Sequence, residues 1–124
     1  MDFLQELAHR LYQRRDEAVV VPIRDCRSAD FEPTEQDCHG NVDRWCRAYT
    51  HHKPVRGWLV SEGYSRPGIC RFIAHSVVED ERGLLFDITP SRASHRYPFL
   101  REEMTEEEYL MLSARQLVHV DHRL

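Results

Sequence analysis

Hydrophobic positions at the start of the chain recur at steps of three and four residues, which is the spacing of one face of an α-helix. This pattern predicts a helix over about residues 2–15. The β-branched run at residues 18–23 predicts a short strand, and Pro22 places that strand at a sheet edge or ends it. Later apolar runs predict strands over residues 55–60, 69–78 and 116–120.

A β-hairpin is predicted over residues 75–90, where two apolar runs enclose a polar turn at residues 79–83 that ends on glycine. The returning strand of this hairpin covers residues 84–88. Polar segments at residues 63–68 and 91–98 predict a turn and a loop. We expect the rest of the chain to be arranged around the hairpin.

A second helix is predicted to begin with either of two capping residues, Thr34, with Asp37 three residues later as a loose capping box, or Asp37 itself. Under either choice Cys38 lies in or near the first turn. Cys38 also belongs to the hydrophobic stripe of this helix, whose other members are Val42, Trp45, Cys46 and Tyr49. Gly40 is a poor helix residue, so we expect it to allow another segment to approach closely. A third helix, over residues 105–112, begins with a threonine cap.

The chain length of 124 residues predicts a single domain over residues 1–124 with one core of modest size. Helices combined with an antiparallel hairpin predict the α+β class. In this fold the helix that carries Cys38 packs against an antiparallel sheet.

The balance of charge and the absence of long apolar runs narrow the functional class. The chain has 17 Lys and Arg residues against 21 Asp and Glu residues, and this net charge of -4 argues against nucleic acid as a partner. No apolar run approaches membrane-spanning length, and the N-terminus lacks the features of a signal peptide. We therefore expect a cytoplasmic protein whose cysteines are reduced and serve as free thiols, metal ligands or a nucleophile. These cysteines are Cys26, Cys38, Cys46 and Cys70.

A cysteine at a helix start, a histidine on one strand and a carboxylate on the next strand occur here in the order that a thiol-nucleophile enzyme needs. The unpaired N–H groups and the dipole of a helix N-terminus favour the thiolate of Cys38. His75 is the candidate base, and Asp87 is the candidate that orients its ring. Gln36 and Asn41 are the side-chain candidates for binding the oxyanion or for positioning, beside the backbone N–H of Cys38.

These residues resemble the papain-like and transglutaminase-like cysteine fold, in which the helix that carries the nucleophile packs on an antiparallel sheet. The segment from His75 through Asp87 to Pro90 is similar to the transglutaminase-like pattern of a histidine, an apolar strand, a turn and an aspartate before a Thr-Pro end. The resemblance implies a hydrolase or acyltransferase that acts on a peptide or amide-type substrate, with Cys38 as nucleophile. Where that family usually has a glycine two residues before the cysteine, this chain has Gln36.

The chain is also similar to a group of small uncharacterised bacterial proteins that share four short motifs. Here these motifs are Cys38-His39-Gly40-Asn41-Val42, Gly57-Trp58, His75-Ser76-Val77 and Asp87-Ile88-Thr89-Pro90. This second resemblance implies a shared fold and assigns no activity.

Other interpretations of the same residues remain open at this point. A small zinc-binding protein has enough soft ligands here, but the Cys-x-x-Cys and Cys-x-x-His spacings are missing, so we predict no metal or cofactor. A non-catalytic binding module on a degenerate papain-like scaffold is the third class. In that class Cys38 is a core residue and Asp87 closes a turn. His39 is expected to point to solvent, because neighbouring positions on a helix diverge.

Overall fold

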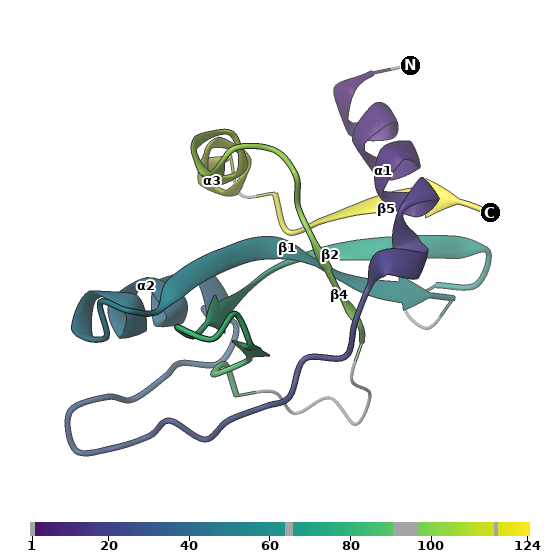
Figure 1. The fold of residues 1–124 in the computed structure, drawn as a ribbon. Coiled ribbons are helices and arrows are strands. Elements are labelled where there is room, and N and C mark those ends of the chain that lie inside the picture. The colour runs from purple at the N-terminus through teal and green to yellow at the C-terminus, as the bar shows by residue number, and fades with distance from the viewer. Residues whose placement is uncertain (1, 64–65, 91–96, 116) are drawn as a thin grey trace. The chain divides into compact units, whose positions relative to one another are not determined.

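The structure, a computed structural model, describes residues 2–63, 66–90, 97–115 and 117–124. These residues form the predicted α+β class, with three α-helices and an antiparallel sheet (Figure 1). The helices are α1 (Phe3–Gln13), the short 3-10 helix η1 (Arg15–Glu17), α2 (Cys38–Ala48) and α3 (Glu106–Ala114). The strands are β1 (Lys53–Glu62), β2 (Ile69–Glu79), β3 (Leu85–Phe86), β4 (Phe99–Arg101) and β5 (His119–Arg123). The sheet order is β3-β2-β1-β4, and β5 also pairs with β2.

The chain forms two compact units, which are described separately below. The first unit comprises residues 1–20, 56–74 and 97–124, and the second comprises residues 21–55 and 75–96. The single domain that the chain length predicts stays a prediction.

The first unit buries the apolar face of α1 against strands β1, β2, β4 and β5. Its core contains Leu7, Leu11, Trp58, Phe72, Leu100, Tyr109 and Val120, among others. Helix α1 begins with a capping box between Asp2 and Gln5, and α3 begins with one between Thr105 and Glu108, as the sequence predicts for α3. Both helices therefore have side-chain partners for their first N–H groups.

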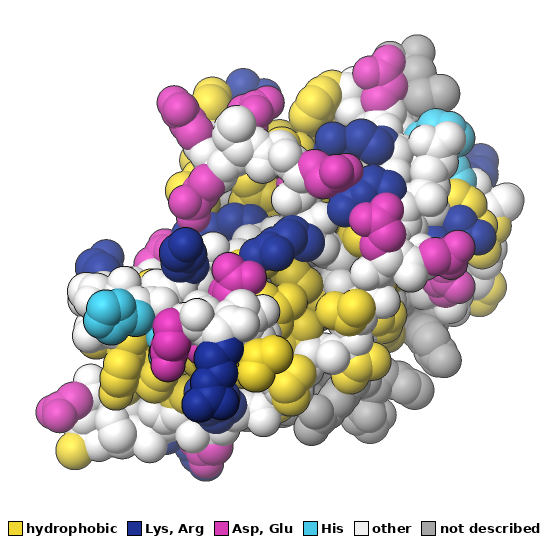
Figure 2. Space-filling model, in the orientation of Figure 1, with side chains coloured by type: hydrophobic (Ala, Val, Ile, Leu, Met, Phe, Trp, Pro, Cys, Tyr) yellow, Lys and Arg dark blue, Asp and Glu magenta, His cyan; other side chains and the backbone are white. Residues whose placement is uncertain are grey.

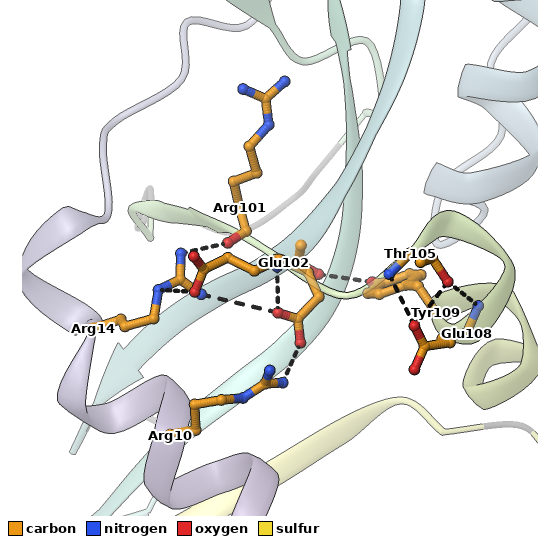
Figure 3. Close-up of polar contacts among 9 residues, drawn as sticks. Arg10, Arg14, Arg101, Glu102, Thr105, Glu108 and Tyr109 are labelled. Atoms are coloured by element: carbon orange, nitrogen blue, oxygen red, sulfur yellow. Dashed lines mark hydrogen bonds and ion pairs between the residues drawn. The ribbon is translucent and has the colours of Figure 1, made fainter.

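A cluster of arginine and glutamate side chains ties α1 to the end of β4 in the first unit (Figure 3). The Glu102 side chain is 1% exposed and accepts a 2.7 Å hydrogen bond from Arg10. Arg14 lies 3.9 Å from the same carboxylate and 2.9 Å from that of Glu103, and it donates a 2.9 Å hydrogen bond to the carbonyl of Arg101. A buried carboxylate is stable only with partners of this kind, so this cluster is a structural link between the two elements.

Gly57 allows β1 and β4 to approach each other closely. A Cβ atom at this position would lie 2.2 Å from the backbone oxygen of Leu100 and 2.7 Å from the ring of Phe99. The carbonyl of Gly57 also accepts a 2.7 Å hydrogen bond from the buried hydroxyl of Tyr109 on α3. The glycine thus fixes both the strand pair and the helix beside it.

The second unit packs α2 against the hairpin of β2 and β3. Its core cluster combines Val42 and Trp45 of α2 with Val78, Phe86 and Ile88 of the hairpin. The hairpin turn is closed by Asp80, whose carboxylate accepts the backbone N–H groups of Arg82 and Leu84. Gly83 completes the turn at a φ of 81°, a conformation that glycine adopts without steric cost.

Several details of the predicted elements need correction or fall outside the described residues. The strand predicted at residues 18–23 is wrong, because Val19 and Ile23 form isolated bridges with Phe99 and Asp87 and the intervening Pro22 has no N–H to donate. The returning hairpin strand is shorter than residues 84–88. The last strand begins at His119, so residues 117–118 do not belong to it, and residue 116 of the predicted strand lies outside the described residues. Strand β4 is not predicted. Residues 64–65 of the predicted turn and residues 91–96 of the predicted loop lie outside the described residues.

Acidic and basic side chains are interspersed over the face shown in Figure 2. Across the described part of the chain, no helix has the length and apolar character needed to cross a membrane.

Candidate active site

Cys38 is the first residue of α2, and Asp37 is its N-cap residue. The Asp37 carboxylate makes no capping hydrogen bond and lies 3.6 Å from Arg44 instead. The alternative cap, Thr34, is wrong, because its backbone N–H and carbonyl bond to the side chain of Asn41. The thiol therefore lies at a helix N-terminus whose N–H groups donate no hydrogen bond to the side chain of the N-cap residue.

The chain reverses direction just before this helix through Gln36. Gln36 has a φ of 62°, in the left-handed region that disfavours residues with a Cβ atom by about 1–2 kcal/mol. Glycine adopts this conformation without steric cost, so Gln36 holds a position that favours glycine. The Gln36 side chain is exposed.

The prediction that Gly40 lets another segment approach is wrong, because its close neighbour is the side chain of Asp37, the N-cap residue of the same helix. A Cβ atom at Gly40 would lie 2.6 Å from both carboxylate oxygens of Asp37. The carboxylate therefore lies over the first turn of α2.

Asn41 is fully buried and uses its whole amide to hold the helix start in place. Its Oδ1 accepts hydrogen bonds from the Thr34 backbone at 2.9 Å and from Arg44 at 2.9 Å. Its Nδ2 donates to the Thr34 carbonyl at 2.8 Å and to the Thr89 hydroxyl at 3.1 Å. Both amide hydrogens are thus engaged, and the geometry gives Asn41 a positioning role between α2 and the segment that follows β3.

His75 and Asp87 meet across the β2–β3 hairpin. The strand register pairs Val78 with Phe86, so one further step places Asp87 opposite Val77, two residues from His75 and on the same face. His75 Nε2 lies 2.7 Å from Asp87 Oδ2, and the two side chains are 11% and 15% exposed. The sequence predicted this contact from the order of the two strands.

Asp87 makes the contacts that both alternative interpretations of the sequence require. One carboxylate oxygen contacts His75, while the other accepts the backbone N–H of Thr89 at 3.0 Å and closes the turn after β3. The backbone of Asp87 is held as well, because its N–H donates to the carbonyl of Pro22 and its carbonyl accepts the N–H of Arg24. The carboxylate that faces His75 is therefore fixed from three directions.

Cys38 and His75 form a coupled pair. Burial raises the pKa of the Cys38 thiol, but hydrogen bonds and charges from His39 and His75 outweigh this effect and lower the pKa from 9.0 to about 6. Burial lowers the pKa of His75, but hydrogen bonds and charges from Asp87 and Cys38 outweigh it and raise the pKa from 6.5 to about 9. Near pH 7 the pair is therefore a thiolate beside an imidazolium.

A second histidine that the sequence placed in solvent also faces this thiol. His39 is half-buried, and its Nδ1 lies 3.9 Å from Cys38 Sγ and 2.5 Å from the hydroxyl of Ser76 on β2. The expectation for His39 was wrong because a fully buried serine beside His75 brings the ring inward. Ser76 was the available signal, since a buried hydroxyl in an apolar strand requires a polar partner.

The other three cysteines lie outside this arrangement, and each is a thiol rather than half of a disulfide bond. Burial raises the pKa of Cys26, and it raises the pKa of Cys70 to about 11. Among the described residues, no group of three or more histidine, cysteine or acidic side chains is placed to hold a metal ion.

Comparisons with protein-family models, with curated proteins and with solved structures gave no significant match to this chain. The arrangement of Cys38, His39, His75 and Asp87 is therefore interpreted from its own geometry.

Proposed function

We propose that this protein is a thiol-nucleophile enzyme that transfers an acyl group from a peptide or amide-type substrate, on a papain-like or transglutaminase-like scaffold. Cys38 is the nucleophile, His75 exchanges the proton, and Asp87 orients the imidazole. The observation that carries the proposal is the continuous contact from a helix-start thiol through a buried imidazole to a carboxylate that is fixed by backbone hydrogen bonds.

In the first half of the reaction the Cys38 thiolate adds to the carbonyl carbon, a C–S bond forms, and negative charge develops on the carbonyl oxygen. The backbone N–H of Cys38, at the start of α2, is a donor available to that oxyanion. The His75 imidazolium then gives its proton to the leaving nitrogen as the C–N bond breaks. The products of this half are a free amine, a thioester at Cys38 and a neutral His75.

In the second half an acceptor, either water or an amine, loses a proton to His75 as it attacks the thioester carbonyl. The new C–O or C–N bond forms, the C–S bond breaks, and the electron pair returns to sulfur as thiolate. Asp87 stabilises the positive charge that His75 carries at the end of this half, because its carboxylate contacts Nε2. The pair thus returns to its starting charge state.

The test is to trap the acyl-enzyme with a small activated ester such as p-nitrophenyl acetate at pH 7. We expect an acetyl thioester at Cys38 and a stoichiometric burst of p-nitrophenolate, followed by turnover. Intact-protein and peptide mass spectrometry locate the acetyl group, and added primary amine distinguishes transfer from hydrolysis by the product formed.

Two controls make the result specific. Cys38→Ser should abolish the burst, and Cys70, a buried thiol with a raised pKa, should remain unmodified in the wild-type protein. Acetylation of Cys26 or Cys46 at the rate of Cys38, or no acetylation of Cys38 at all, would refute the proposed function.

A further inference from the structure

The thiol of Cys38 has two imidazole neighbours, and each is held by a different partner. His75 is held by the Asp87 carboxylate, whereas His39 is held by the Ser76 hydroxyl. Ser76 is fully buried, so its hydroxyl has no access to bulk water and bonds within the protein. His39 follows Cys38 directly in the first turn of α2, which gives it a rigid backbone.

The Ser76 hydroxyl can bond to the His39 ring whether or not Nδ1 carries a hydrogen. A hydroxyl donates one hydrogen and also accepts, so Ser76 can donate to a bare Nδ1 of His39 or accept from a protonated Nδ1. The single hydrogen of a protonated Nδ1 is shared between the Ser76 hydroxyl at 2.5 Å and the Cys38 sulfur at 3.9 Å, whereas a bare Nδ1 accepts either from Ser76 or from the thiol S–H. A carboxylate in place of Ser76 could only accept, and it would hold the ring in one state.

We propose that His39 is a second positioning residue for the Cys38 thiolate and that Ser76 acts through it. This inference rests on the proposed function, because it assigns a role in the same site. The nucleophile thus has two imidazole neighbours with different tasks: His75 exchanges a proton with the leaving group and the acceptor, while the His39 ring, which Ser76 orients, turns its Nδ1 toward the sulfur.

The second imidazole matters most when the thioester breaks down. At that step the electron pair of the C–S bond returns to Cys38, while His75 is taking a proton from the acceptor. A hydrogen on His39 Nδ1 lies between the Ser76 hydroxyl and the departing thiolate, so it adds to the stabilisation that the N–H groups at the start of α2 provide.

The experiment measures the pH profile of Cys38 alkylation by limiting iodoacetamide, resolved by peptide mass spectrometry. It compares the wild type with His39→Gln and Ser76→Ala, and His51→Gln is the matched control because His51 is exposed in the same unit. Thermal melts of all four proteins are recorded in parallel. The midpoint of the profile reports thiol ionisation, which a purely structural contact would leave unchanged.

We expect the midpoint of His39→Gln to rise while that of His51→Gln stays at the wild-type value. A midpoint of about 7 in place of about 6 leaves about a tenth of the Cys38 thiol ionised at pH 6 instead of half, about a fivefold loss of thiolate. Ser76→Ala should raise the midpoint by less, and it should add nothing in the His39→Gln background, because Ser76 acts through His39.

An unchanged midpoint in His39→Gln would overturn the inference while leaving the proposed function intact. A wild-type midpoint near 8.5, the value of an ordinary cysteine, would instead overturn the proposed function. If His39→Gln does not fold, Ser76→Ala decides the inference alone, since a raised midpoint supports it and an unchanged midpoint refutes it.

Discussion

Replacing Asp87 by asparagine separates the two tasks of this side chain, because the two residues have the same shape. The wild-type carboxylate accepts two hydrogen bonds, from His75 on one oxygen and from the Thr89 backbone on the other. The amide of asparagine has one oxygen and one NH₂ group, so it serves only one of these donors. If the oxygen stays with Thr89, the NH₂ group faces His75 Nε2 and forces the neutral ring with its proton on Nδ1.

The size of the effect follows from the charge that is lost. A hydrogen bond to a charged group contributes about 1.5–3 kcal/mol, and one pKa unit corresponds to about 1.4 kcal/mol. Removal of the carboxylate should therefore lower the pKa of His75 from about 9 to between about 7 and 8. The thiolate of Cys38 loses part of its counter-charge, so the pKa of Cys38 should rise from about 6.

The assay is the pH profile of Cys38 alkylation in the wild type and in Asp87→Asn, with thermal melts beside it. Asp80→Asn is the matched control, because Asp80 also closes a turn of the hairpin through two backbone N–H groups but is not among the groups that shift the pKa of Cys38 or His75. We expect Asp80→Asn to leave the profile unchanged and Asp87→Asn to shift it to higher pH. Superimposable profiles for Asp87→Asn and the wild type, with intact melts, would remove Asp87 from the site.

Three further outcomes follow from the structure. Gly57→Ala should destabilise the first unit by about 3 kcal/mol or more in denaturant titrations, because the new methyl group collides with the backbone oxygen of Leu100. Glu102→Ala should lower the free energy of unfolding by about 1.5–3 kcal/mol, because it removes the hydrogen bond between Arg10 and a buried carboxylate, whereas Glu103→Ala, whose carboxylate is 65% exposed, should change it by less than about 1 kcal/mol. The rate of acyl transfer from an amide substrate should rise as the pH passes about 6, because the Cys38 thiol ionises there. The rate should fall as the pH passes about 9, because the His75 imidazolium then loses the proton that the leaving nitrogen needs. A rate that stays constant between pH 5 and 10 would contradict this pairing.

Local sequence signals predicted the helices well. The Thr105 cap and the steps of three and four residues near the N-terminus act within a few residues, so they are legible in the sequence. The three-residue strand β4 has no such signal, since it exists through pairing with β1 more than forty positions earlier in the chain. The apolar run at residues 18–23 was misread for the same reason, because its pairing partners are distant.

The candidate site shows the same division between local and distant information. The order of Cys38, His75 and Asp87 along the chain indicated that these side chains could meet, because a helix start and a hairpin constrain them. The inward position of His39 depends on Ser76, which is 37 residues away, and no helical periodicity encodes that contact. The backbone hydrogen bonds that Asp87 makes with Pro22 and Arg24 are equally non-local.

These backbone hydrogen bonds of Asp87 link the pKa of the Cys38 thiol to the folding of the second unit. In an unfolded chain Cys38 has the pKa of an ordinary thiol, about 8.5, and is almost fully protonated at pH 6. The lowered pKa requires His75 in place, His75 requires Asp87, and the backbone of Asp87 requires residues 22–24. Reactivity of Cys38 at pH 6 is therefore a built-in reporter of native structure, and chain segments that are still being made or have locally opened carry an unreactive thiol.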